Sequence, residues 1–233
     1  MSFSFEPIAH IESCFKEKFG IPRQPGLVGE AVARIKLVSP YCQPESVKGL
    51  EQYSHIWVQF VFHESIQKEW KATVRPPKMG GNKRIGVFAT RSNFRANPIG
   101  LSVVKLEKIE VENNKVILVV KGGDFLDGTP VLDIKPYVPY SDVISEAKSG
   151  LSCPVVAPKA LVLSPKSQAQ LLEIEKDIPS FFKFISELLQ NDPRPGYQKQ
   201  DDRVYGCHIY DYNLMWKCSA SEITVVSIDK LTK

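Results

Sequence analysis

The sequence predicts a mainly β fold, with an N-terminal β-barrel formed from a single sheet and a smaller C-terminal α+β domain. Three observations support it. Short segments rich in Val, Ile, Phe and Trp alternate with Gly, Pro and Asn turns over the first 140 residues. Sustained helical periodicity appears only in the last third, and a Ser-, Pro- and Ala-rich stretch separates the two regions. Short strands without covering helices must hide their edges on one another, which favours a closed barrel.

The barrel strands are expected in chain order, each bounded by turn-forming residues. The turn at 112–114 joins two of them as a hairpin, and the short helical signal at 44–50 is too brief for a crossover between parallel strands. The expected strands are 32–38, 55–62, 85–90, 101–111, 115–120 and 131–134. We assign residues 1–145 to the barrel domain and 146–160 to a linker.

Residues 161–233 form the expected α+β domain. Ser164 is placed to cap a helix that has Pro165 at its first position, and Pro179 opens a second helix. Apolar residues recur along one stripe of that second helix and predict core packing. They are Phe181, Phe184, Ile185, Leu188 and Leu189. Three strand-like stretches follow, near 204–210, 213–218 and 223–228.

Composition excludes several classes of protein. Among the 233 residues, 43% are hydrophobic and 24% are charged, an ordinary globular balance. The chain shows neither an apolar run long enough for a spanning helix nor a signal-peptide pattern. We therefore expect a cytoplasmic protein with no membrane partner. The five cysteines form no CxxC pair and the four histidines are scattered, so neither a disulfide framework nor a metal site is expected.

Positive charge is concentrated in one segment. The net charge is +4, yet residues 68–95 carry eight basic residues and one acid, interleaved with aromatic residues. This pattern is typical of a surface for phosphates and stackable bases, although a solvated basic loop would look the same. The chain lacks GxGxxG, GxxxxGK[ST] and GxSxG patterns. A nucleotide-like ligand would therefore bind through polar loops at the barrel rim, and an esterase is disfavoured.

Polar residues gather in a few loops. Residues 86–100 carry two arginines, two asparagines, Thr and Ser between apolar stretches, and Arg91 at the end of an expected strand is the strongest candidate for binding. The turn at 127–130 offers a carboxylate, a hydroxyl and backbone groups to a small polar ligand, and the loop at 22–26 is stiff and charged. These residues also have plainer interpretations: Arg91 as a structural arginine and 127–130 as an ordinary turn. His63, which follows the expected strand 55–62, has a plainer interpretation as a surface residue.

Six motifs together resemble the TsaA-like family and, within it, the bacterial TrmO proteins. The motifs are residues 17–27, 55–57, 73–77, 86–100, 127–137 and 192–195, which span nearly the whole chain. The chain departs from the family pattern at Ala96, where the family usually has proline.

The resemblance implies an S-adenosylmethionine-dependent methyltransferase built on a single β-barrel. It implies methylation of the exocyclic amine of threonylcarbamoyladenosine, next to the anticodon of threonine tRNA. It also implies a homodimer with the cofactor site near the subunit contact, and a C-terminal domain that helps hold tRNA. Carried over motif by motif, the cofactor residues are Pro22, Arg23, Gln24, His63, Glu64, Arg91, Leu101, Asp127, Gly128, Thr129 and Pro130.

An adenine amine is poorly nucleophilic, so a group should orient it and take its proton. Asp127, Asp133 and His63 remain equal candidates for this role. Phe88 or Phe94 could stack on an extruded base. The expected RNA contacts are Lys78, Lys83, Arg84, Arg95 and Arg194. Two alternatives remain, a non-catalytic RNA-binding module that keeps the basic groove and an enzyme acting on a small nucleotide.

Overall fold

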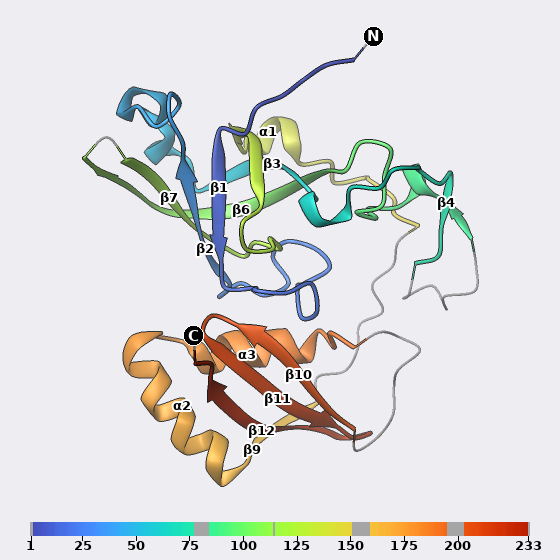
Figure 1. Ribbon diagram of the computed structural model, residues 1–233, viewed down its shortest axis with the longest axis vertical. Helices are drawn as coiled ribbons and strands as arrows, with labels where there is room; N and C mark the ends of the chain where they lie inside the picture. Colours follow the sequence, from blue (N-terminus) through green and yellow to red (C-terminus); the bar gives the residue numbers. More distant parts are fainter. Residues whose placement is uncertain (1, 77–83, 114, 151–158, 195–202, 233) are drawn as a thin grey trace.

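The structure is a computed structural model that describes residues 2–76, 84–113, 115–150, 159–194 and 203–232. It has two domains, one above the other in Figure 1, with the N-terminal β domain above and the smaller C-terminal domain below. No helix in these described ranges is long and apolar enough to cross a membrane.

Six antiparallel strands close the N-terminal barrel, as the sequence predicts. Their order around the barrel is β1 (Ala9–Ser13), β2 (Val32–Leu37), β7 (Lys115–Lys121), β6 (Ile99–Glu112), β3 (His55–Val61) and β8 (Pro130–Pro136). Alternate side chains point inward, as Ile56, Val58 and Phe60 do on β3. A Cβ at Gly100 would lie 2.2 Å from the Phe60 ring, so glycine is required where β6 passes this ring.

One expected barrel strand is wrong. Of residues 85–90, only β5 (Ile85–Gly86) is a strand, and it pairs with β4 (Thr73–Val74) outside the barrel. The chain then turns through η5 (Val87–Ala89), where the Thr90 hydroxyl donates to the Val87 carbonyl at 2.8 Å. The barrel position belongs instead to β1, which the sequence pattern did not reveal.

Short helical turns connect the barrel strands. A single α-helical turn, α1 (Pro139–Asp142), follows β8. Its Asp142 carboxylate accepts hydrogen bonds from the Trp57 indole at 3.0 Å and the Val138 amide at 2.8 Å. The remaining turns are η1 (Pro44–Val47), η2 (Leu50–Gln52) and η3 (His63–Ser65).

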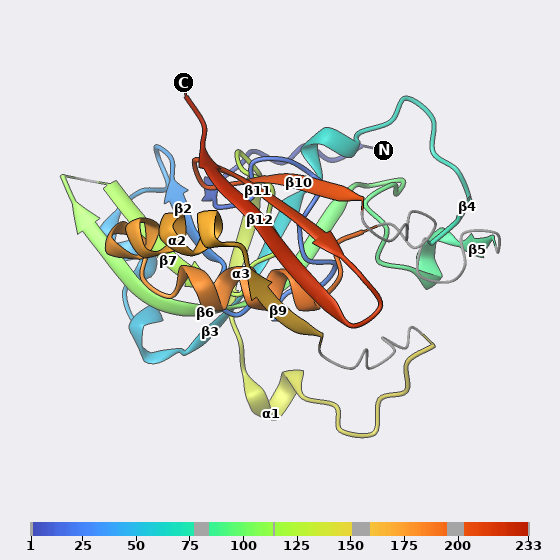
Figure 2. The ribbon, with the colours of Figure 1, turned by 90° about the horizontal axis from the view of Figure 1, so that it is seen from below.

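The C-terminal domain packs two helices on a four-stranded sheet (Figure 2). Its elements are β9 (Ala160–Leu163), α2 (Pro165–Asp177), α3 (Phe181–Gln190), β10 (Val204–Ile209), β11 (Tyr212–Cys218) and β12 (Glu222–Lys230). Both predicted helices are confirmed. The Ser164 hydroxyl accepts a hydrogen bond from the Ser167 amide at 3.0 Å, and all five residues of the predicted α3 stripe are buried. β9, which starts at the last residue of the expected linker, was not predicted.

The two domains share a core. Phe15 and Val28, from the chain between β1 and β2, are buried in the same cluster as the apolar side of α3. Backbone hydrogen bonds join this connection to β10: the Tyr210 amide donates to the Cys14 carbonyl at 2.7 Å, and the Lys16 amide to the His208 carbonyl at 3.3 Å. The connection from β1 to β2 is therefore held from the C-terminal side.

Candidate functional site

Arg91 joins two of the segments singled out by the sequence. It follows η5 in an exposed position, and its guanidinium donates a hydrogen bond to the Gln24 side-chain carbonyl. Gln24 lies in the β1–β2 connection, far away in sequence. Two predicted cofactor residues from different loops are thus in direct contact.

The segment with His63 and Glu64 is tied to the same loops. It forms η3 close after β3, and the buried Ser65 hydroxyl accepts a hydrogen bond from the Asn93 side-chain amide at 2.7 Å. On the other side, the Lys18 ammonium donates to the Glu64 carbonyl at 2.7 Å and lies 3.4 Å from its carboxylate. η3 therefore links the Arg91 loop to the β1–β2 connection.

Asp124 is a member of this neighbourhood that the sequence reasoning missed. The Ser102 hydroxyl, on β6 beside Leu101, donates to the Asp124 carboxylate at 2.6 Å. Burial raises the pKa of Asp124 to about 6, although the Ser102 hydrogen bond and the charge of Arg91 both act to lower it. The only sequence signal was an aspartate after a Gly-Gly pair, between a strand and the 127–130 turn.

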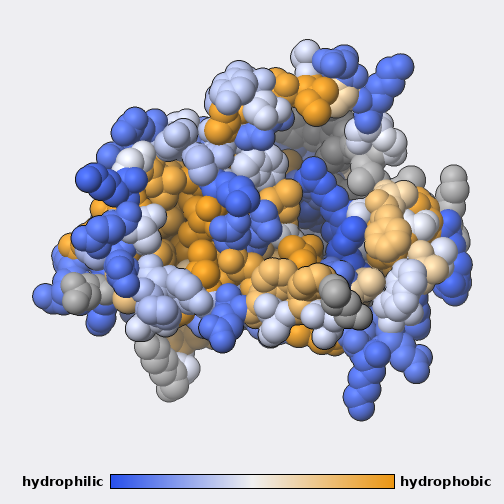
Figure 3. All heavy atoms as spheres, turned by 90° about the horizontal axis from the view of Figure 1, so that it is seen from above, coloured by the Kyte–Doolittle hydropathy of each residue, from blue (hydrophilic) through white to orange (hydrophobic). Residues whose placement is uncertain are grey.

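β6 also carries apolar side chains on its outer side. Leu101 lies opposite Gln59 in the β3–β6 register and, with Ile99, faces out of the barrel with much of its side chain exposed. Figure 3 shows that hydrophobic side chains reach the outer surface of the barrel domain beside a hollow with hydrophilic groups. Such a mixed surface suits a ligand with an apolar part and charged ends.

The turn at residues 127–130 is hydrogen-bonded to β1 and to the residues that follow it. The Asp127 carboxylate accepts from the Ser13 amide at 2.8 Å and lies 3.0 Å from the Lys16 ammonium. The Asp127 and Gly128 amides donate to carbonyls of the β1 region, and the Thr129 hydroxyl donates to the Leu126 carbonyl at 2.7 Å. The amides of Asp127, Gly128 and Thr129 are therefore engaged within the fold, and the role of this turn at the cofactor stays a prediction.

The three candidate proton acceptors differ in their surroundings. The Asp127 carboxylate is engaged by Ser13 and Lys16. Asp133, on the outer side of β8, lies 2.8 Å from the Lys135 ammonium and accepts from the Ile134 amide. His63 is half-buried in η3, at the junction of the two loops described above.

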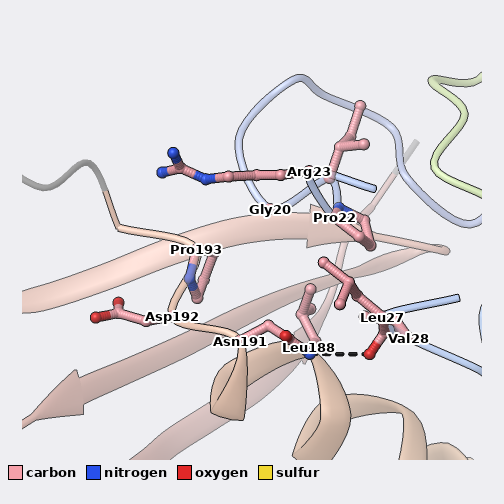
Figure 4. A pocket seen from close by; sticks show the side chains of 10 residues that line it. Gly20, Pro22, Arg23, Leu27, Val28, Leu188, Asn191, Asp192 and Pro193 are labelled. Atoms are coloured by element: carbon pink, nitrogen blue, oxygen red, sulfur yellow. Dashed lines mark hydrogen bonds between the residues drawn. The ribbon is translucent and has the colours of Figure 1, made fainter. Parts of the chain in front are cut away.

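A small pocket lies where the C-terminal domain meets the loop with Pro22, Arg23 and Gln24 (Figure 4). The pocket lies between residues 20–28 and the end of α3, and Pro22 and Arg23 line it. The Asn191 side-chain amide donates to the Leu27 carbonyl at 2.8 Å, and the Arg23 guanidinium approaches the Arg194 carbonyl at 3.5 Å. The position of the loop with Pro22, Arg23 and Gln24 therefore depends on the end of α3.

The expected RNA contacts stay predictions, and the structure describes only some of these residues. Lys78 and Lys83 lie outside the described residues. Arg84 is exposed and donates to the Thr73 hydroxyl at 3.2 Å, whereas the Arg95 guanidinium donates to the Thr90 carbonyl at 2.8 Å.

Arg194 does not fit its predicted role as an RNA contact. It is 6% exposed and makes an ion pair with Asp192, with an N–O distance of 2.8 Å. Its guanidinium also lies over the Tyr205 ring, 5.6 Å from the centroid. Arg194 is a structural arginine at the domain junction. Within the described ranges, no three or more His, Cys, Asp or Glu residues gather as metal ligands would.

Comparisons with known proteins agree with the resemblance seen in the sequence. The family models of the tRNA-methyltransferase O N-terminal domain and the TrmO C-terminal domain match residues 10–143 and 157–231. The chain is 44% identical to the tRNA (adenine(37)-N6)-methyltransferase of Escherichia coli, over 98% of both chains. It is 43% identical to a putative S-adenosylmethionine-dependent methyltransferase of Pseudomonas aeruginosa, over 93% of both.

Solved structures extend the likeness to the fold. A crystal structure of TrmO superposes with a TM-score of 0.81 at 38% identity, covering 98% of this chain and 100% of that one. A TrmO structure from Pseudomonas aeruginosa gives a TM-score of 0.80 at 38% identity, with 98% and 99% coverage. Both domain models, full-length relatives and the shared fold lead to one conclusion: the chain belongs to the tRNA-methyltransferase O family.

Proposed function

We propose that this protein is an S-adenosylmethionine-dependent tRNA (adenine(37)-N6)-methyltransferase of the cytoplasm. We further propose that it methylates N6 of threonylcarbamoyladenosine in threonine tRNA. The observation that supports this most is the linked neighbourhood of Gln24, η3, Arg91 and the Ser102–Asp124 pair. Relatives from Escherichia coli to rat are named tRNA (adenine(37)-N6)-methyltransferase, which supports the first of these proposals.

The residues present fit this cofactor. When bound, S-adenosylmethionine supplies a methyl group activated by a positively charged sulfur. Arg91 offers a guanidinium to a carboxylate, and Asp124 offers a carboxyl group to a cation. Leu101 offers exposed apolar surface on β6, next in the chain to Ser102. A ligand with a carboxylate, a positive centre and a flat base matches this set.

The chain's own contribution is alignment, water exclusion and proton removal. We propose that His63 orients the adenine amine and accepts its proton. The carboxylates of Asp127 and Asp133 are already engaged by Lys16 and Lys135. His63 instead stands in η3, which the Asn93–Ser65 hydrogen bond ties to the Arg91 loop.

Replacement of His63 should separate catalysis from cofactor binding. We expect His63→Ala to lower kcat about 100-fold, since a positioned general base contributes on that order. Single-turnover methylation of tRNA measures this, with cofactor affinity by calorimetry as the second readout. An unchanged kcat would remove His63 from the reaction, and His63→Gln should fail like the alanine variant if proton transfer is its role.

The function itself is tested with tRNA from a strain that lacks the protein. Purified protein and S-adenosylmethionine should add one methyl group to threonylcarbamoyladenosine, detected by mass spectrometry of the nucleosides. Absence of the product, together with RNA binding and no heat of cofactor binding, would favour the non-catalytic RNA-binding module. Methylation of free nucleotides would favour the third alternative.

We also propose that the protein is a homodimer. Ile99 and Leu101 leave an apolar strip exposed on β6, close to the proposed cofactor residues. Burial of such a strip by a second copy would stabilise the assembly. Light scattering of the purified protein gives the molar mass that tests this.

The raised pKa of Asp124 makes stability depend on pH. The unfolded chain releases this proton near pH 4 and the folded chain near pH 6. Stability is therefore lost as the pH rises between these values, up to about 3 kcal/mol. Asp124→Asn should unfold like the wild type at pH 3.5 and be more stable at pH 8, as measured by urea titration. Equal differences at both pH values would contradict this origin.

A further inference from the structure

Two aromatic rings are stacked on each other at the protein surface, outside both cores. The Trp70 and Phe88 ring centroids lie 6.1 Å apart with an interplanar angle of 27°. Trp70 is 52% exposed and Phe88 is 73% exposed. Neither belongs to either hydrophobic cluster of the described residues. An exposed apolar pair of this size is unusual unless it serves contact with a partner.

The β4–β5 hairpin holds the pair away from the barrel. The Val87 amide donates to the Ala72 carbonyl at 2.9 Å, which brings the chain after Trp70 against the start of η5. Both ribbon views place this hairpin at the periphery, beyond the six barrel strands (Figures 1 and 2). The rings are thus fixed in position and accessible.

Exposed basic residues lie near both rings in the chain. Lys68, Lys71, Arg75 and Arg84 flank them in the chain and are exposed. None makes an ion pair with a carboxylate in the described part of the chain. Cations that keep their charge free beside exposed rings are complementary to phosphates joined to flat bases. A second copy of this basic segment would instead repel it.

We propose that Trp70 and Phe88 form a stacking platform for an unpaired nucleotide of the tRNA anticodon loop, other than the adenine that is methylated. This inference rests on the proposed function. Phe88 precedes Arg91 by three residues, so the platform adjoins the proposed cofactor site in the chain. Because Phe88 is already stacked on Trp70, its ring offers one outer side to a base. The target adenine requires the separate position beside His63.

The first test is RNA affinity at fixed salt. Phe88→Ala should weaken binding of an anticodon stem-loop roughly 5- to 150-fold, the range found for loss of one base–aromatic stack. Phe88→Tyr should bind like the wild type, and so should Tyr140→Ala, which removes another exposed ring, on α1. Affinity for S-adenosylmethionine should not change in any of these variants. An unchanged affinity of Phe88→Ala for the stem-loop would overturn the proposal.

Tryptophan fluorescence gives a second, independent readout. Of the three tryptophans, Trp216 is buried, and Trp57 is half-buried and hydrogen-bonded to Asp142. Trp70 is therefore the most exposed tryptophan. The stem-loop should quench its emission, a duplex of equal length should not, and Trp70→Phe should remove the quenching. Quenching that grows with protein concentration without RNA would identify a second copy as the occupant and overturn the proposal. Wild-type protein that binds no tRNA would instead contradict the proposed function.

Discussion

Replacing Arg91 with alanine should lower the affinity for S-adenosylmethionine at least tenfold with little change in the free energy of unfolding. Arg91 is exposed, and its guanidinium donates a hydrogen bond to the Gln24 side chain. A single exposed hydrogen bond contributes about 1 kcal/mol or less to stability. The same group near the Asp124 carboxyl would bind a ligand carboxylate by a charge-assisted contact, which is roughly twice as strong.

Calorimetry with the cofactor and thermal unfolding measure the two effects of Arg91→Ala separately. Arg84→Ala is the matched control, because Arg84 is also an exposed arginine with one hydrogen bond, to Thr73. Its cofactor affinity should equal that of the wild type. Arg91→Lys should recover part of the loss, since it keeps the charge without the planar fork. Wild-type affinity in Arg91→Ala would remove this residue from the site.

Deletion of the chain from Leu161 onward should abolish cofactor binding and destabilise the barrel domain. The deletion exposes Phe15 and Val28, which are buried against α3. Each large apolar side chain contributes about 1.5–3 kcal/mol when buried, and a whole domain is stable by only about 5–15 kcal/mol. It also removes the contacts of Lys183 and Glu187 with Glu30.

Point variants distinguish loop positioning from general unfolding. Asn191→Ala removes the hydrogen bond to the Leu27 carbonyl and should weaken cofactor binding several-fold with a small change in Tm. Gln168→Ala, in an exposed position of α2, is the control and should change neither. A truncated protein that keeps wild-type cofactor affinity would contradict the coupling. Truncation therefore does not separate a tRNA enzyme from a small-nucleotide enzyme, because both would lose activity.

The alternation of apolar and polar residues was enough to predict most strands of the barrel, but not its first strand. β3 alternates large apolar and outward-facing residues, a clear signal over seven positions. β1 has only Ala9, Ile11 and Ser13 facing inward, so its pattern is weak. β9 is even shorter, with four residues, and it pairs with β12, about 60 residues further along the chain. Both strands form because of tertiary pairing, which sequence periodicity does not report.

Some site residues can likewise be recognised in the sequence, whereas others depend on the fold. Arg91 was found because fork donors concentrated in a loop are visible in the sequence. Asp124 was missed because its importance comes from burial and from Ser102, which lies 22 residues earlier. Arg194 was expected to contact RNA, whereas it makes an ion pair with Asp192 and lies over the Tyr205 ring. The charge of a side chain does not reveal whether that side chain is buried.

The bridge of Phe15 to both Leu126 and Ile209 has a consequence for synthesis on the ribosome. Phe15 is translated early, but its partner Ile209 belongs to β10, which is translated close to the end of the chain. Contacts of such high sequence separation slow folding and leave apolar surface exposed meanwhile. Nascent chains should therefore stay sensitive to protease in the segment around Phe15 until β10 has left the exit tunnel.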